Sequence, residues 1–93
     1  MTITNIRFIK LFADGGLKAV SSVTIDDCLV IDEILVIRGE SGLFVSMPCS
    51  RSRNGLLVNK IHLIGSEEKR EFEEKIIEAY NDYARQHTPS TIY

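Results

Sequence analysis

The 93-residue sequence contains no tryptophan, two prolines and two cysteines, and no apolar run that approaches the roughly 20 residues of a membrane-spanning helix. The cysteines, Cys28 and Cys49, lack the spacing of a metal motif, and we expect both to be reduced, half-buried small residues. The first seven residues alternate polar and apolar side chains and do not form a signal-peptide pattern. These absences predict a cytoplasmic protein with no membrane partner.

Residues that support catalysis are also scarce. The two histidines, His62 and His87, are far apart in the sequence, and a lone histidine is more often a surface residue than a base. The acidic pairs at residues 26–27 and 32–33 have no third ligand at metal-binding spacing. The sequence contains no glycine-rich phosphate loop and no nucleophile elbow. We therefore expect no enzyme activity, no metal site and no small-molecule cofactor.

The net charge of -2 does not indicate a nucleic-acid-binding protein, but the charges are unevenly distributed. Residues 1–65 contain 7 Lys or Arg against 6 Asp or Glu, whereas residues 66–93 contain 4 against 7. An anion-binding surface is therefore expected as a local patch in the first two-thirds of the chain.

Alternating polar and apolar residues predict four strands, separated by turns rich in glycine and aspartate. The expected strands cover residues 2–12, 17–25, 28–38 and 43–47. The third needs a bulge near Asp32-Glu33 to bring its apolar residues onto one face. Pro48 ends the fourth because proline has no N–H to donate. The sequence therefore predicts a small antiparallel sheet of four to five strands.

A C-terminal helix completes the predicted α+β fold. Ser66 is a suitable N-cap, and the apolar residues that follow recur at helical spacing: Phe72, Ile76, Ala79, Tyr80 and Tyr83. We expect one domain over residues 1–87 and a flexible tail over residues 88–93. A chain this short buries a modest core and leaves free strand edges, which favours a homodimer.

Residues 49–60 carry the weakest structural signals. Asn54-Gly55 is typical of a turn, and segments 56–58 and 61–64 could form short flanking strands. Alternatively, the whole segment is a flap that reorders when a ligand binds.

This segment also carries the candidate binding residues. Arg51 and Arg53 could each contact phosphate oxygens, with Lys60 as a third cation. Ser50, Ser52 and Asn54 could contribute selectivity. Lys18 and Arg38 are weaker candidates. The alternative interpretation is that the arginines only make an exposed loop soluble.

The sequence resembles the SpoVG family of bacterial septation regulators. The resemblance is carried by Asp14-Gly15-Gly16-Leu17-Lys18-Ala19, by the block Gly42-Leu43-Phe44-Val45-Ser46-Met47-Pro48, and by the acidic helix that ends in Ala79-Tyr80. The family usually continues after Met-Pro with Ser-Lys-Arg, whereas this chain has Cys49-Ser50-Arg51 and then Arg53. Two outcomes are open: Arg53 compensates for the missing lysine, or binding is weaker or differently selective.

The resemblance implies a small dimeric regulator that binds DNA, with RNA as a further candidate. It also implies effects on gene expression, septation and, in spore formers, sporulation. The alternative is a protein-interaction adaptor of the division machinery, which would use a strand edge or the Leu56-Leu57-Val58 segment and would not bind nucleic acid directly.

Overall fold

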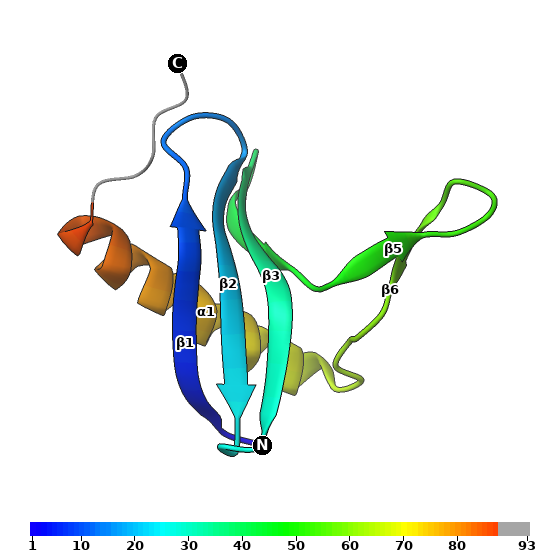
Figure 1. The fold of residues 1–93 in the computed structure, drawn as a ribbon, viewed down its shortest axis with the longest axis horizontal. Helices are drawn as coiled ribbons and strands as arrows, with labels where there is room; N and C mark the ends of the chain where they lie inside the picture. Colours follow the sequence, from blue (N-terminus) through cyan, green and yellow to red (C-terminus); the bar gives the residue numbers. More distant parts are fainter. Residues whose placement is uncertain (88–93) are drawn as a thin grey trace.

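The computed structural model describes residues 1–87, and its main element is a four-stranded antiparallel sheet (Figure 1). The strands lie in the spatial order β1-β2-β3-β4, which is also their order in the sequence. Their bounds are β1 (Ile3–Leu11), β2 (Leu17–Ile25), β3 (Leu29–Gly39) and β4 (Gly42–Ser46). All four predicted strands are confirmed, each within one residue of its expected ends. The expected tail, residues 88–93, lies outside the described residues.

The turns between these strands follow from local backbone chemistry. Asp26 and Asp27 have φ angles of 51° and 54°, so both adopt the left-handed conformation of a hairpin turn that suits the right-handed twist of β2 and β3. Aspartate tolerates this conformation better than most residues do.

The predicted bulge in β3 is present. Ile31 pairs with Val23 and Ile34 pairs with Ser21, so β3 has one residue more than β2 over this interval. Glu33 has a left-handed backbone with a φ of 59°, which accommodates the extra residue of the bulge. As a result Ile31 and Ile34 are both buried.

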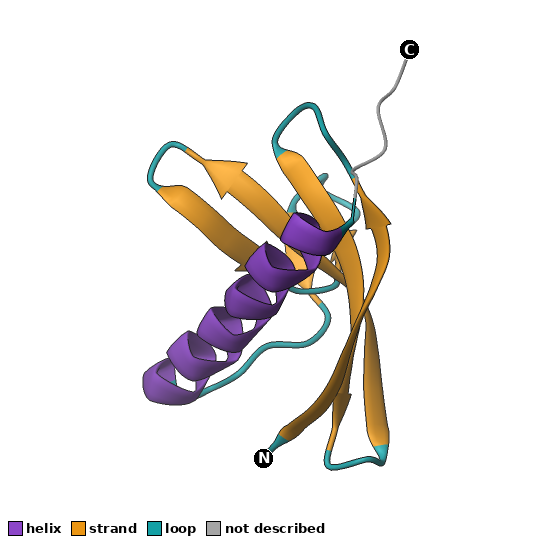
Figure 2. Ribbon diagram, turned by 90° about the vertical axis from the view of Figure 1, so that its left-hand side faces the viewer, coloured by secondary structure: helices purple, strands orange, loops and turns teal. Residues whose placement is uncertain are grey.

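Helix α1 (Ser66–Gln86) crosses one face of the main sheet (Figure 2). Phe72, Ile76 and Tyr80 are the buried residues of the helix, which confirms the predicted apolar stripe. At the β1 side, the ring of Phe8 lies 6.2 Å from that of Tyr80 and 5.0 Å from that of Tyr83, measured between centroids. The core is therefore sandwiched between the sheet and α1, and no helix of residues 1–87 covers the opposite face of the sheet.

The predicted cap at Ser66 is wrong by one residue. Gly65 is the N-cap, with an extended backbone, and no side chain caps the helix. The Gly65 carbonyl accepts a hydrogen bond from the Lys69 amide at 3.0 Å, so the first helical turn has already formed around Ser66.

Strands β5 (Cys49–Arg51) and β6 (Leu57–Asn59) form a separate two-stranded antiparallel sheet. This hairpin projects away from the main sheet and from α1 (Figure 1). Of the two short strands predicted beside the turn, the first is confirmed at Leu57-Val58, whereas residues 61–64 form no strand. Within residues 1–87, no helix is long and apolar enough to cross a membrane.

Candidate nucleic-acid interface

Residues 49–60, called the basic hairpin below, bring most of the predicted site residues into one projecting unit. Its register pairs Cys49 with Asn59, Ser50 with Val58 and Arg51 with Leu57. The base of the hairpin is closed by the Lys60 amide, which donates to the Pro48 carbonyl at 2.8 Å. Every residue from 49 to 60 is exposed.

The tip of the hairpin is built from its own hydrogen bonds. The Gly55 amide donates to the Ser52 carbonyl at 3.0 Å, and the Ser52 amide donates to the Leu56 carbonyl at 2.7 Å. Gly55 has a φ of 80°, which a residue with a side chain adopts at a cost. The Ser52 hydroxyl accepts from the Leu56 amide at 3.2 Å, so Ser52 shapes the tip as well as lying on it.

The two arginines occupy different positions at this tip. Arg51 Nη1 donates to the Gly55 carbonyl at 3.0 Å, which holds its guanidinium over the tip and leaves other N–H groups for a ligand. Arg53 lies in the loop itself and is exposed. Neither arginine takes part in an ion pair within residues 1–87. The sequence has no acidic residue between Glu40 and Glu67, so the hairpin itself offers no carboxylate that could pair with either arginine.

Lys60 lies at the base of the hairpin, but the weaker candidates lie elsewhere. Lys18 Nζ donates to the Ala13 carbonyl at 3.2 Å, and the Arg38 amide donates to the Gly16 carbonyl at 2.8 Å. Both therefore lie at the end of the sheet where β4 begins, whereas the hairpin follows the end of β4. Because a five-residue strand spans about 16 Å, the structure does not join these two residues to the basic hairpin.

The residues that could support catalysis do not converge. Asp32 accepts a hydrogen bond from the Ser22 hydroxyl at 2.8 Å. His87 stacks on Tyr83 with ring centroids 3.8 Å apart. In the part of the chain that the structure describes, no three His, Cys, Asp or Glu residues lie together as metal ligands. Cys28 and Cys49 are free and exposed, so the prediction that they are half-buried is wrong. Cys28 lies in the turn between β2 and β3, and Cys49 is the first residue of the exposed strand β5.

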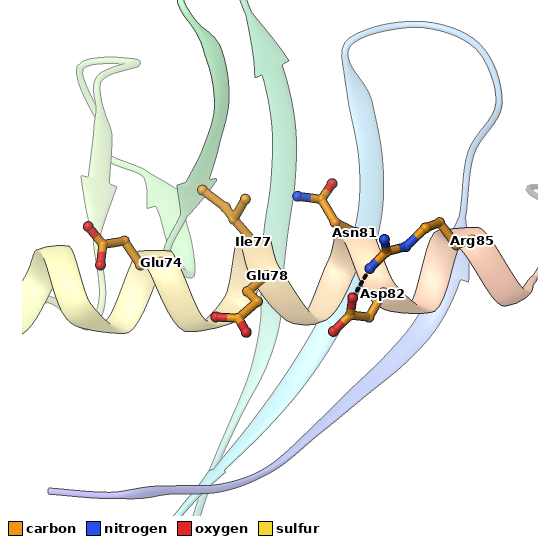
Figure 3. Close-up of a pocket in the computed structure, with 6 residues that line it drawn as sticks. All are labelled: Glu74, Ile77, Glu78, Asn81, Asp82 and Arg85. Carbon is orange, nitrogen blue, oxygen red and sulfur yellow. Dashed lines mark hydrogen bonds and ion pairs between the residues drawn. The ribbon is translucent and has the colours of Figure 1, made fainter.

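The outer face of α1 is acidic. Figure 3 shows Glu74, Glu78 and Asp82 around a surface hollow that Ile77, Asn81 and Arg85 also line. Arg85 is paired with Asp82 and Arg70 with Glu74, which leaves Glu78 as the carboxylate of this surface without an ion pair in residues 1–87. A polyanion would be repelled here and attracted to the basic hairpin.

A cleft of about 400 Å³ lies between β4, the base of the hairpin and the first turns of α1. Its lining comes from Phe44, Val45, Ser46, Met47, Asn59, His62, Leu63, Lys69, Phe72 and Glu73. The sequence analysis assigned no binding role to any of these residues. They are separated by up to 29 positions and form no motif, so only the fold brings them together.

The fold and the site together define a class of protein, a small α+β domain that projects a basic β-hairpin from the edge of an antiparallel sheet. The model of the family described as SpoVG matches residues 1–82, and the chain belongs to this family.

Three relatives illustrate the similarity, and each is named "Putative septation protein SpoVG". The protein from Staphylococcus carnosus is 37% identical over 88% of this chain and 77% of its own length. That from Macrococcus caseolyticus is 38% identical over 88% of this chain and 71% of its own length. That from Staphylococcus aureus strain JH9 is 37% identical over 88% of this chain and 82% of its own length.

Proposed function

We propose that this protein is a cytoplasmic, non-enzymatic regulator that binds DNA as a homodimer, and RNA through the same contacts to the backbone. Its role is in septation and gene expression and, if its organism forms spores, in sporulation. Membership of the SpoVG family and the names of the septation relatives support the biological part of this proposal. The structure supports the binding part through the basic hairpin.

The observation that carries the proposal is a pair of exposed guanidinium groups on a projecting hairpin, without a carboxylate partner in residues 1–87. The planar guanidinium group matches a phosphate through two parallel hydrogen bonds. A two-stranded β-ribbon also fits the major groove of B-form DNA, which is about 12 Å wide. The basic hairpin can therefore approach a duplex with Arg51 and Arg53 directed at the backbone.

Contacts to phosphate position a protein but do not read sequence. Ser50 and Asn54 are two exposed polar side chains of the hairpin that are available for contacts to base edges, whereas the Ser52 hydroxyl already accepts a bond from the Leu56 amide. An asparagine amide can donate and accept at once, as recognition of adenine requires.

The apolar side chains of the hairpin support the homodimer. Leu56 is 66% exposed, Leu57 68% and Val58 50%. A lone two-stranded hairpin is only marginally stable in water, and here each strand has three residues. A second copy that covers these side chains would stabilise the hairpin and place six cations, from two sets of Arg51, Arg53 and Lys60, on one dimer.

The same exposed apolar residues favour the adaptor as a second candidate. A protein partner that covers Leu56, Leu57 and Val58 would need no nucleic acid. Binding of such a partner would depend weakly on salt, whereas phosphate binding weakens steeply as salt rises.

The test is a fluorescence-anisotropy titration of labelled duplex DNA with the wild-type protein and with the Arg51→Ala/Arg53→Ala variant. The homodimer loses four charge-assisted contacts in this variant. If each contributes about 1 kcal/mol, the variant binds roughly 700-fold more weakly. The Arg70→Ala/Arg85→Ala variant removes the same charge from α1 and is expected to keep its affinity, because those arginines pair with Glu74 and Asp82. Equal affinities of the hairpin variant and the wild type would refute the proposed interface.

A further inference from the structure

The residues proposed to contact a duplex backbone, Arg51, Arg53 and Lys60, do not line the cleft beside the basic hairpin. We propose that it receives one unpaired nucleobase of a single-stranded nucleic acid whose phosphates are held by the hairpin; this inference rests on the function proposed above. The cleft volume of about 400 Å³ lies within the 300–1,000 Å³ typical of small-molecule sites.

The lining of the cleft offers apolar contacts for the face of a base and polar groups for its edge. Met47 and Leu63, both half-buried, supply apolar contact for the face of the ring. Asn59 and His62 are exposed and lie on the lining, so their side chains are free to meet a base. An amide can pair with the polar edge of a base, and an imidazole ring can stack on its face.

The charges of the cleft favour a base over a phosphate. Lys69 and Glu73 line it together, so one positive and one negative side chain nearly cancel. A phosphate group would meet the Glu73 carboxylate, whereas an uncharged base can accept from Lys69 and donate to Glu73. The cleft therefore suits an uncharged base, whereas the basic hairpin suits the phosphates.

The cleft and the basic hairpin adjoin in the protein, so one nucleic-acid strand can contact both. Asn59 lines the cleft and is followed directly by Lys60, the cation at the base of the hairpin. The connector from β6 then runs to the first turn of α1 (Figure 1). A base inside a duplex is stacked and paired and cannot enter a cleft, whereas an unpaired base can be splayed out from the backbone.

The test compares a labelled single strand with the corresponding duplex, using the His62→Ala and Asn59→Ala variants. Each is expected to bind the single strand at least about fivefold more weakly, the lower end of what contact with one base contributes, and to bind the duplex within about twofold of wild type. The salt dependence of single-strand binding is expected to stay the same in both variants, because neither removes a phosphate contact. Asn81→Ala, on the distant half of α1, and His87→Ala, at the C-cap of α1, are matched controls and are expected to leave both affinities unchanged.

A second measurement locates the base directly. A single strand that carries one photoreactive uracil is cross-linked to the wild-type protein, and the cross-linked peptide is mapped. We expect attachment within residues 44–47 or 59–63. Attachment confined to the hairpin tip would overturn the inference.

The outcomes separate this inference from the proposed function. If Arg51→Ala/Arg53→Ala weakens binding but His62→Ala and Asn59→Ala bind the single strand as wild type does, the cleft inference fails and the function stands. If the cleft variants change the dimer mass in light scattering and not the affinity for the single strand, the cleft is occupied by a second copy and the inference also fails. If the wild type binds neither oligonucleotide, the proposed function fails and the inference falls with it.

Discussion

The salt dependence of DNA binding gives a quantitative test of the basic hairpin, because the number of phosphate contacts sets its slope. A dimer in which Arg51, Arg53 and Lys60 of both copies contact phosphates makes six contacts, which predicts that log K falls with log salt at a slope of about -5.4. A fourfold rise in salt, from about 50 to about 200 mM, then weakens binding by about 1,800-fold. In the Arg51→Ala/Arg53→Ala variant only the two lysines remain, so the slope is about -1.8 and the same rise weakens binding by about 12-fold.

The measurement is an anisotropy titration of duplex DNA at four or more concentrations of a monovalent salt, without magnesium. The Arg70→Ala/Arg85→Ala variant provides the control for net charge and is expected to keep the wild-type slope. Circular dichroism and light scattering confirm that each variant is folded and has the wild-type mass. A hairpin variant with the wild-type slope would show that the phosphates are contacted elsewhere on the protein.

Three further predictions concern the fold and the assembly. Ser21 is fully buried, and its hydroxyl donates to the Ile34 carbonyl at 2.8 Å, so Ser21→Ala is expected to cost about 1 kcal/mol and lower the Tm by about 4–8 °C in a thermal melt. An unchanged Tm would show that this bond adds no net stability. Asp27 has a left-handed backbone, so Asp27→Gly is expected to raise the Tm by a few degrees, and a lower Tm would contradict this account of the turn. Leu57→Ser/Val58→Ser is expected to halve the mass measured by light scattering, because the exposed apolar strand no longer favours a second copy; an unchanged dimer would place the interface elsewhere.

The elements that could be predicted from the sequence are those that a local pattern determines. The bulge at Asp32-Glu33 follows from the interrupted alternation in β3, since burying both Ile31 and Ile34 requires an extra residue between them. The helix stripe follows in the same way from the spacing of its apolar residues, because a helix of this length must bury one face. The turn at Asn54-Gly55 belongs to the same group, since Gly55 adopts the left-handed conformation at the hairpin tip.

The features that could not be predicted depend on contacts between distant segments. Ser66 and Gly65 are both acceptable N-caps by residue type, and the helix begins after Gly65. The pairing of β5 with β6 has no alternation to signal it, because all residues of both strands are exposed. The cleft has no sequence signal, since β4, the connector and α1 contribute to it separately.

The basic hairpin contributes no residue to the hydrophobic core, and its strands pair only with each other. Its sequence is therefore under little constraint from the folding of the sheet and α1, and a hairpin from a relative could be grafted between Pro48 and Ile61 to give a chimera that folds. Changes of reach, charge or tip residues would then accumulate in evolution at small thermodynamic cost. Such an exchangeable part lets one scaffold acquire new target preferences while its interior stays the same.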